Sequence, residues 1–374
     1  MSRLLKNLRS IPRTGNGIPQ PGSILGRHVA VLSLGLRYLT FKKIGNMLRC
    51  ELEKFKRSAR VRSFPYVAVI DVTNACNLRC PYCPTGARRD SGRKRRRIDL
   101  SELEALIDEI GDYVVSANLY NWGEPFLHPD IGAIVKAFHQ KGVLTVISSN
   151  LSFHNDEALK SVCDMGLDHL VVSFSGASQE TYEKYHRTGK LDQVLANLRQ
   201  LNEYKRTLGL TRPLVECKYL LFRHNRHEIE SARKIAIESG ADLFRVVPAG
   251  GPEEAILQNA EQQSAHAPLC HQLCHTVVLN ADGGVSPCCF LFFKDDDLGM
   301  YSPAGPGQGD LVDIRNSELA VTARSFFNRN EVGRLPVDLK HPCLKCHLVH
   351  EQPHLREYLK SNPNAQQTHR TAGP

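Results

Sequence analysis

Between residues 64 and 250, short apolar runs alternate regularly with amphipathic stretches. The runs are rich in Val, Ile, Leu and aromatic residues, as is typical of strands buried on both faces. They lie at 66–72, 114–120, 143–148, 168–174, 214–222 and 242–247. The stretches between them have a helical pattern and lie at 101–112, 130–141, 155–165, 178–208 and 226–239. This alternation predicts an α/β fold in which a parallel sheet forms a partial (β/α)6 barrel over residues 64–250.

The pattern differs on either side of this region. Residues 1–63 are basic and predict an N-terminal extension that is partly helical; its helix either packs on the main domain or lies on a membrane surface. Residues 251–350 are loop-rich, hold six cysteines and contain a hairpin signal from Thr276 to Val285. They predict a small second domain. Residues 351–374 are polar, and we predict a disordered tail there.

The net charge of +9 has a local origin. The segment Arg88–Arg97 holds seven basic residues and one acid, so it contributes most of the excess. We expect a solvated loop, or a contact with an anionic substrate or a membrane surface, and no nucleic-acid partner. The apolar residues near the N-terminus form neither a bilayer-spanning segment nor a signal peptide, which predicts a cytoplasmic protein, with a peripheral membrane contact left open.

Twelve cysteines are many for a chain without a predicted export signal, and their clustering indicates metal rather than disulfides. Cys76, Cys80 and Cys83 have C-x3-C-x2-C spacing directly after the first apolar run. Three such thiolates suit three corners of a four-iron cluster and leave the fourth iron without a protein ligand. A structural zinc site would need a fourth ligand, and none lies within this loop.

Other polar residues follow the next predicted strands. Gly123-Glu124-Pro125 follows the second strand, Ser149-Asn150 ends the third, and Ser173 ends the fourth. Because parallel strands end at the same edge of a sheet, these residues and the three cysteines are expected to share one rim.

The sequence CNLRCPYC, the GEP motif and the Ser-Asn pair after strand three together resemble the radical S-adenosylmethionine (SAM) enzymes over residues 64–250. The resemblance implies that Cys76, Cys80 and Cys83 bind a [4Fe–4S] cluster whose open iron is chelated by SAM. Reductive cleavage of SAM then gives a 5′-deoxyadenosyl radical, which abstracts a hydrogen atom from a substrate.

The resemblance also implies which residues hold SAM. Glu124, in the Gly123-Glu124-Pro125 motif, would accept from the SAM ammonium group, and Ser149 and Asn150 would contact its ribose or carboxylate. Ser173 and Arg187 match positions that hold the carboxylate, and Tyr82 matches an aromatic residue beside the adenine. Relatives often read Ser-x-Asp-Gly after strand four, whereas this chain has Ser175 in place of the aspartate.

The later cysteines are similar to a shortened SPASM, or twitch, domain. The positions that match are Cys270, Cys288, Cys343 and Cys346, which implies one auxiliary [4Fe–4S] cluster. Cys274 or Cys289 is an alternative ligand, and a zinc site is the alternative metal. Cys217, Cys274 and Cys289 are also candidate hydrogen-atom donors.

Three functions stay open. The first is oxidation or epimerisation of a sugar-like or aminocyclitol substrate, small molecule or glycan, with an electron donor such as flavodoxin or ferredoxin. The second is a peptide-modifying maturase of the SPASM type. The third is a non-catalytic iron–sulfur protein that binds a partner through its basic loop.

Overall fold

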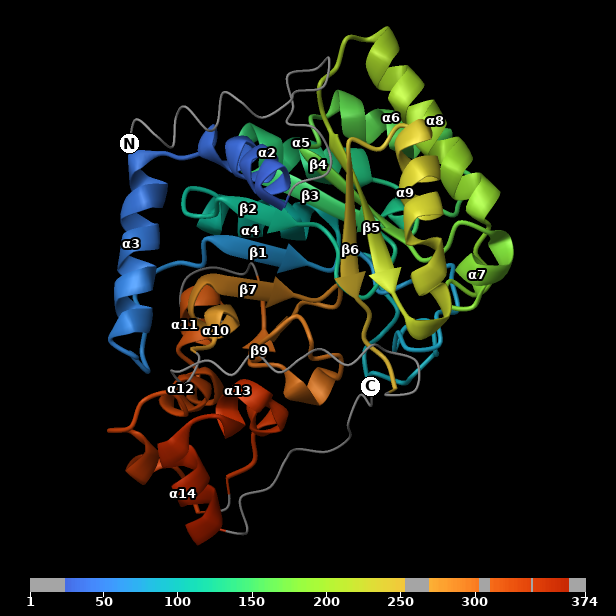
Figure 1. Cartoon of the computed structure of the whole chain (residues 1–374). Coiled ribbons are helices and arrows are strands. Elements are labelled where there is room, and N and C mark those ends of the chain that lie inside the picture. The colour runs from blue at the N-terminus through green and yellow to red at the C-terminus, as the bar shows by residue number, and fades with distance from the viewer. Residues whose placement is uncertain (1–23, 253–268, 303–309, 338, 363–374) are drawn as a thin grey trace, which may run out of the picture.

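The computed structural model describes residues 24–252, 269–302, 310–337 and 339–362. A nine-stranded sheet with the order β6-β5-β4-β3-β2-β1-β7-β8-β9 organises this part of the chain (Figure 1). The strands from β6 to β7 in this order pair in parallel, and β8 and β9 add antiparallel pairs at one edge. Their bounds are β1 Val67–Ile70, β2 Ser116–Asn118, β3 Leu144–Ser149, β4 His169–Phe174, β5 Leu214–Leu221, β6 Leu243–Pro248, β7 Thr276–Leu279, β8 Gly284–Ser286 and β9 Gly299–Met300. The predicted α/β fold with a partial parallel barrel is confirmed.

Helices cover the outer face of the six-stranded part, as the apolar pattern predicts (Figure 1). They are α4 Leu100–Ile110, α5 Ile131–Gln140, α6 Asp156–Asp164, α7 Gln179–Glu183, α8 Leu191–Thr207 and α9 Ile229–Glu238. The short 3₁₀ helix η1 Pro125–Leu127 precedes α5, and a second one, η2 Arg223–Glu228, precedes α9. The single helix predicted over 178–208 is therefore wrong. It divides into α7 and α8 because Thr188 takes a left-handed conformation (φ 68°) and Gly189 packs against the Tyr182 ring. The break places Arg187 in a loop.

Two N-terminal helices precede the sheet, α2 Ile24–Leu36 and α3 Phe41–Phe55. Ala30 and Leu34 of α2 pack on inward-facing residues at the starts of four strands, which are Leu144, Val146, Val171, Leu214 and Leu243. These residues alternate with those that face the outer helices, as a pleated strand requires. Helix α2 thus covers the barrel interior at the N-terminal ends of its strands. The prediction for residues 1–23 lies outside the described residues.

The C-terminal region begins by extending the same sheet. β7 pairs with β1, and Val277, Leu279 and Val285 belong to the main core. A second apolar core then forms around Phe326, Leu344 and Leu355. The helical elements of the C-terminal region are α10 His271–His275, η3 Lys294–Asp296, α11 Leu311–Arg315, α12 Glu318–Ser325, η4 Val332–Arg334, η5 Pro342–Lys345, α13 His347–His350 and α14 Pro353–Ser361. Of these, α11 packs into the main core through Leu311 and Ile314.

The disordered tail predicted from residue 351 is wrong for its first part. Helix α14 occupies Pro353–Ser361 because Leu355 is completely buried in the second core. Residues 363–374 lie outside the described residues, and the domain boundary predicted at residue 250 stays a prediction. In the described ranges, no helix combines the length and the apolar composition that a bilayer crossing requires.

Candidate cluster site at the carboxyl end of the sheet

The three cysteines of the first motif lie in a compact loop after β1. The N–H of Cys83 donates to the Cys80 carbonyl at 3.3 Å, and the N–H of Ala87 donates to the Cys83 carbonyl at 2.8 Å. Gly86 packs so closely that a Cβ there would lie 2.6 Å from the backbone N and O of Cys80. The loop therefore folds back on itself, and its three thiol groups are near enough to influence one another electrostatically.

The thiol groups are poorly suited to ionise without a cation. Burial raises the pKa of Cys76 to about 12, and burial together with the neighbouring thiols raises the pKa of Cys80 well above its ordinary value. In the described part of the chain, no three His, Cys, Asp or Glu side chains form a site for a single metal ion. A polynuclear iron–sulfur cluster fits the donor set, because soft thiolates are its usual ligands and its iron would supply the missing positive charge.

The GEP segment is fixed to the cysteine loop by backbone contacts. The N–H of Glu124 donates to the Ala75 carbonyl at 2.8 Å, just before Cys76. Gly123 lies so near the Thr73 carbonyl oxygen that a Cβ would fall 1.6 Å from it, so only glycine fits. Pro125, which is buried, begins the turn η1.

Asp71 is a site residue that the sequence analysis missed. It directly follows β1, is 2% exposed, and accepts from the N–H groups of Trp122 and Gly123 at 3.2 and 3.1 Å. Burial raises its pKa to about 7. Its place directly after an apolar strand was the available signal.

The Glu124 carboxylate is buried and connects two strands. Its Oε1 accepts from the Ser149 hydroxyl at 2.8 Å and from the Phe126 N–H at 3.2 Å, and its Oε2 accepts from the Asn150 N–H at 2.8 Å. Burial raises its pKa to about 7 despite these donors. Its predicted contact with the SAM ammonium group stays a prediction; the observed contacts fix the end of β3.

Asn150 then reaches back to the cysteine loop. Its Nδ2 donates to Asn77 Oδ1 at 2.9 Å and lies 4.0 Å from Cys76 Sγ. Asn77 in turn donates to the Ser152 carbonyl at 2.7 Å. The structure therefore brings together the cysteine loop, the GEP segment and the Ser-Asn pair as one hydrogen-bonded unit.

The remaining predicted SAM contacts approach the same loop from other elements. The Arg187 carbonyl accepts from the Arg79 N–H at 3.0 Å, and the Arg187 side chain is exposed. The ring of Tyr82 lies 6.0 Å from those of Tyr185 and Phe222, and Gly251 approaches it closely. Their roles in binding SAM stay predictions.

Ser173 begins a row of polar residues across β4, β5 and β6 that includes two basic residues the sequence analysis did not single out. It is in register with Lys218 on β5, which is in register with Arg245 on β6. Burial and Arg245 lower the pKa of Lys218. Glu216, one step earlier on the same face of β5, pairs with Arg245 and with His169. Charged residues at alternate positions of an apolar strand were the signal for this polar interior.

Cys217 does not share this interior. It faces the opposite side of β5, is completely buried in the core beneath the outer helices, and pairs in register with Val172 and Phe244. This placement argues against Cys217 as a hydrogen-atom donor, and we do not propose it.

A second group of cysteines lies in the C-terminal region. Electrostatic interactions connect Cys270 with Cys346, Cys289 and Cys288, and connect Cys343 with Cys270 and Cys346. Burial raises the pKa of Cys343, and a hydrogen bond with Cys289 together with burial raises that of Cys288. The four predicted ligands and Cys289 therefore gather, and their donor set fits a second cluster.

Cys274 belongs to the edge of this group. Its carbonyl accepts from Cys50 Sγ at 3.2 Å, and its thiol group interacts with those of Cys50 and Cys270. Burial raises its pKa to about 12. Whether Cys274 or Cys289 replaces a predicted ligand stays open.

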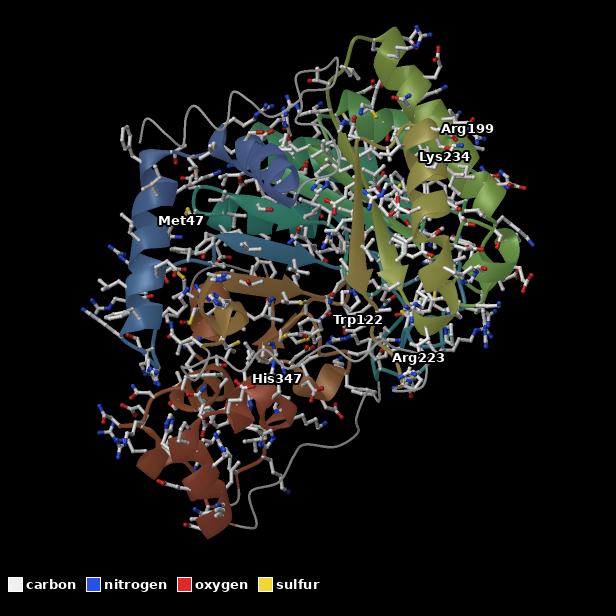
Figure 2. The ribbon with its side chains drawn as sticks, viewed as in Figure 1. Met47, Trp122, Arg199, Arg223, Lys234 and His347 are labelled. Atoms are coloured by element: carbon white, nitrogen blue, oxygen red, sulfur yellow. The ribbon has the colours of Figure 1, made fainter. Side chains whose placement is uncertain are left out.

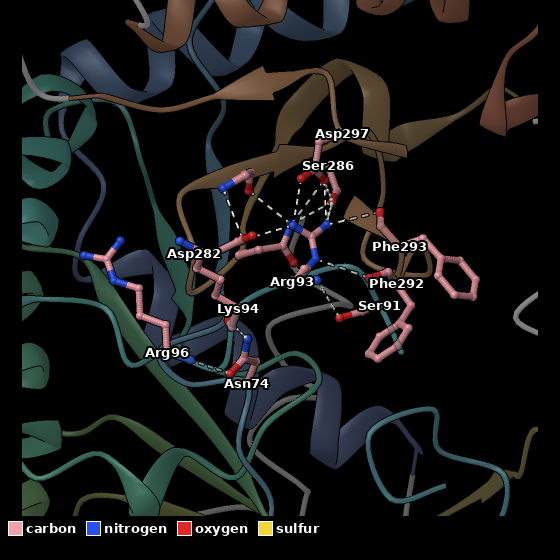
Figure 3. Close-up of polar contacts among 12 residues, drawn as sticks. Asn74, Ser91, Arg93, Lys94, Arg96, Asp282, Ser286, Phe292, Phe293 and Asp297 are labelled. Atoms are coloured by element: carbon pink, nitrogen blue, oxygen red, sulfur yellow. Dashed lines mark hydrogen bonds and ion pairs between the residues drawn. The ribbon is translucent and has the colours of Figure 1, made fainter. Parts of the chain in front are cut away.

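The basic segment Arg88–Arg97 is partly fixed in place (Figure 3). Arg93, with 3% of its side chain exposed, bonds both oxygens of Asp297 at 2.7 Å and Asp282 Oδ1 at 3.0 Å. Arg96 pairs with Asp99 and Glu102. The prediction of a solvated loop is therefore wrong for Arg93, which attaches the segment to the β7–β9 region, whereas Arg96 stays partly exposed in a surface ion pair with α4.

A cavity of about 300 Å³ opens between this segment and the cysteine loop. Cys76 lies in its wall, as do Trp122 and Phe292, whose rings meet edge to face at 5.3 Å. Trp122 lies between the barrel and the C-terminal region (Figure 2) and donates to the Leu291 carbonyl at 3.3 Å. The basic side chains of the wall are Arg79, Arg88, Arg89, Arg93 and Arg95.

The model of the radical SAM superfamily matches residues 70–232, the span that contains the cysteine loop, the GEP segment and the polar ends of β3 and β4. The chain contains a radical SAM domain. The resemblance to radical SAM enzymes that the sequence motifs indicate is therefore confirmed.

The radical SAM chain is similar to the PqqA peptide cyclase of Bradyrhizobium diazoefficiens, at 26% identity over 52% of this chain and 49% of that protein. It is also similar to the GTP 3′,8-cyclase of Chlorobaculum tepidum, at 30% identity over 37% of this chain and 42% of that protein. The chain thus spans about half or less of the length of these relatives. A crystal structure of Streptococcus suis SuiB bound to S-adenosylmethionine superposes with a TM-score of 0.56 at 16% identity, covering 81% of this chain and 75% of that one, which shows a shared fold.

Proposed function

We propose that this chain is a radical SAM enzyme that modifies a peptide and holds two [4Fe–4S] clusters. Cys76, Cys80 and Cys83 would hold the first cluster, and Cys270, Cys288, Cys343 and Cys346 the second. When bound, the first cluster and SAM supply the electron and the 5′-deoxyadenosyl radical that start hydrogen-atom abstraction. The similarity to radical SAM proteins implies this chemistry.

The observation that carries the proposal is the hydrogen-bonded unit around Glu124. Its carboxylate holds Ser149 and Asn150, and Asn150 contacts Asn77 beside Cys76. Three segments far apart in the sequence are thereby held at one end of the sheet. A cofactor that is bound through both a cluster and polar groups needs such pre-arranged contacts.

A peptide substrate is preferred to a sugar-like one. The PqqA peptide cyclase, which matches over 52% of this chain, is named for a peptide substrate. The relatives cited above are cyclases, and none is named for dehydrogenation or epimerisation. Oxidation or epimerisation of a sugar-like or aminocyclitol substrate therefore becomes the second candidate.

The cavity beside Cys76 supports a substrate with acidic side chains. Arg79, Arg88 and Arg95 line it and have no acidic partner in the described parts of the chain. The Thr85 hydroxyl oxygen is buried at this cavity without a hydrogen-bond partner among the described residues. Guanidinium groups bind carboxylates through paired hydrogen bonds, so an acidic peptide segment complements the wall.

The first experiment measures 5′-deoxyadenosine after anaerobic reconstitution with iron, sulfide, dithionite and SAM. The wild type should release it, and Cys76→Ala should not. Cys163→Ala is the matched control, because Cys163 is buried in the outer core far from the loop in sequence and is not a predicted ligand. Equal release from all three proteins, or from none, would contradict the proposal.

The second experiment counts iron. Two clusters give about eight iron per chain, and Cys343→Ala should reduce this to about four while the SAM-binding cluster remains. A wild-type value of about four iron with bound zinc would replace the second cluster by a zinc site. Synthetic peptides rich in Glu should increase 5′-deoxyadenosine release more than Gln-substituted peptides or an aminocyclitol; the reverse order would favour the second candidate.

A further inference from the structure

Helix α3 exposes a continuous row of large apolar side chains. Phe41, Ile44, Leu48, Leu52 and Phe55 are 96%, 40%, 67%, 51% and 81% exposed. Their spacing of three and four residues places them on one face over the whole length of the helix. Helix α2 adds Leu32 and Leu36, so seven of the thirteen exposed large apolar residues in the described ranges belong to these two helices.

The opposite face of α3 fixes this exposure. Lys43 donates to the Gly142 carbonyl at 2.5 Å, Asn46 exchanges two hydrogen bonds with the backbone of Phe64, and Cys50 is buried against α10. Helix α3 stands at the edge of the molecule, beside the starts of β1 and β2 (Figure 1). It is therefore held by its polar and small residues and turns its large apolar residues outward, the reverse of an ordinary packed helix.

The charges around the apolar row are positive. Arg49 and Lys56 lie along one side of it, and Arg37 lies in the link between α2 and α3. All three are exposed and have no acidic partner among the described residues. On the other side Lys54 pairs with Glu51 and leaves no net charge.

We propose that the outward face of α2 and α3 binds the surface of an anionic lipid membrane. An apolar row flanked by unpaired cations is the arrangement by which a helix lies in the interface, with its apolar side chains among the acyl chains and its cations at the phosphates. A monomeric soluble protein rarely leaves an apolar patch of this extent uncovered. The charge favours anionic lipid over a neutral apolar partner.

The proposal is independent of the radical SAM reaction. The α3 face consists of residues that contribute nothing to the cluster sites described above. Its failure would leave the proposed function intact, and 5′-deoxyadenosine release measured on the same variants separates the two.

The test is flotation of the reconstituted full chain with vesicles of phosphatidylglycerol and phosphatidylcholine, compared with phosphatidylcholine alone. The wild type should float with the anionic vesicles. Leu48→Asp combined with Phe55→Asp should reduce binding at least about tenfold, because each change removes apolar contact and adds repulsion. Arg49→Gln combined with Lys56→Gln should reduce binding to the anionic vesicles by about tenfold. At high salt this variant and the wild type should bind equally, because the charges are screened.

Val337→Asp is the matched control, because Val337 is 64% exposed in the C-terminal region. It should bind like the wild type, and every variant should still release 5′-deoxyadenosine. Equal flotation of the Leu48/Phe55 variant and the wild type would overturn the proposal. So would a stable dimer in light scattering that Leu48→Asp dissociates, since the face would then be covered by a second copy of the chain.

Discussion

The Ser175 hydroxyl lies 2.6 Å from Nδ1 of His186, and both side chains are completely or almost completely buried. Ser175 occupies the position at which relatives often have an aspartate. His186 stacks on Tyr182 at 4.7 Å and immediately precedes Arg187. The pair therefore connects the end of β4 to the loop that carries a predicted SAM contact.

Removal of the Ser175 hydroxyl should destabilise the fold. Ser175→Ala leaves the buried His186 nitrogen without its partner, which should lower the free energy of unfolding by about 1–3 kcal/mol. Ser239→Ala is the matched control, because the Ser239 hydroxyl is buried without a partner in the described part of the chain. Urea unfolding should show no loss for Ser239→Ala, and equal losses for both variants would contradict a specific role for the pair.

His186 should also make stability depend on pH. Burial lowers its pKa to about 3, so the unfolded chain binds the proton first as the pH falls. The contribution of neutral His186 to the free energy of unfolding is complete above the unfolded pKa of about 6.5. It should fall by about 2 kcal/mol between pH 7 and pH 5. His186→Gln retains a hydrogen-bonding side chain but cannot titrate.

The measurement is the difference between the wild type and His186→Gln in urea unfolding at several pH values. The difference cancels the opposite effect of Asp71 and Glu124, whose raised pKa values favour the folded state at lower pH. Parallel curves for the two proteins would show that His186 is not the titrating group.

The strand–helix alternation could be predicted because each strand residue alternates between two buried environments, and that pattern is local. The rim at the carboxyl ends of the strands was also predictable, since parallel strands end together. The partner of Glu124 was not predictable from the sequence. A carboxylate can accept hydrogen bonds from a bound ligand or from other groups of the same chain. Only the contacts with Ser149 and Asn150 distinguish the two.

Contacts between residues far apart in the sequence were the main feature that could not be predicted. Arg93 belongs to a run of like charges that indicates a solvated loop, and its partners Asp282 and Asp297 lie about two hundred residues later. The join of β7 to β1 has the same cause. The orientation of Cys217 was in principle predictable, because Glu216 and Lys218 on either side face the polar interior.

Glu124 should be required for cofactor binding through its hold on β3. Glu124→Gln places an amide where three donors converge, so Ser149 and Asn150 should lose their alignment with the cysteine loop. We expect 5′-deoxyadenosine release to fall by about 10–100-fold, with a weaker affinity for SAM, as for other residues that orient ligands. Glu104→Gln, at an exposed position on α4, should have no effect. An unchanged affinity for SAM in Glu124→Gln would contradict this role.

Arg93 should be the most important basic residue for stability in its segment. Arg93→Ala leaves Asp282 and Asp297 buried without their cation, which should cost about 3–5 kcal/mol in the free energy of unfolding. Arg95→Ala, two residues away and exposed, should change it by less than about 0.5 kcal/mol. Replacing both acids as well, in Arg93→Met with Asp282→Asn and Asp297→Asn, should recover part of the loss because the unpaired charges are gone. Thermal unfolding of the wild type and the three variants checks this order. If Arg95→Ala loses as much stability as Arg93→Ala, the general charge of the segment holds it against the sheet, rather than the buried group of Arg93, Asp282 and Asp297.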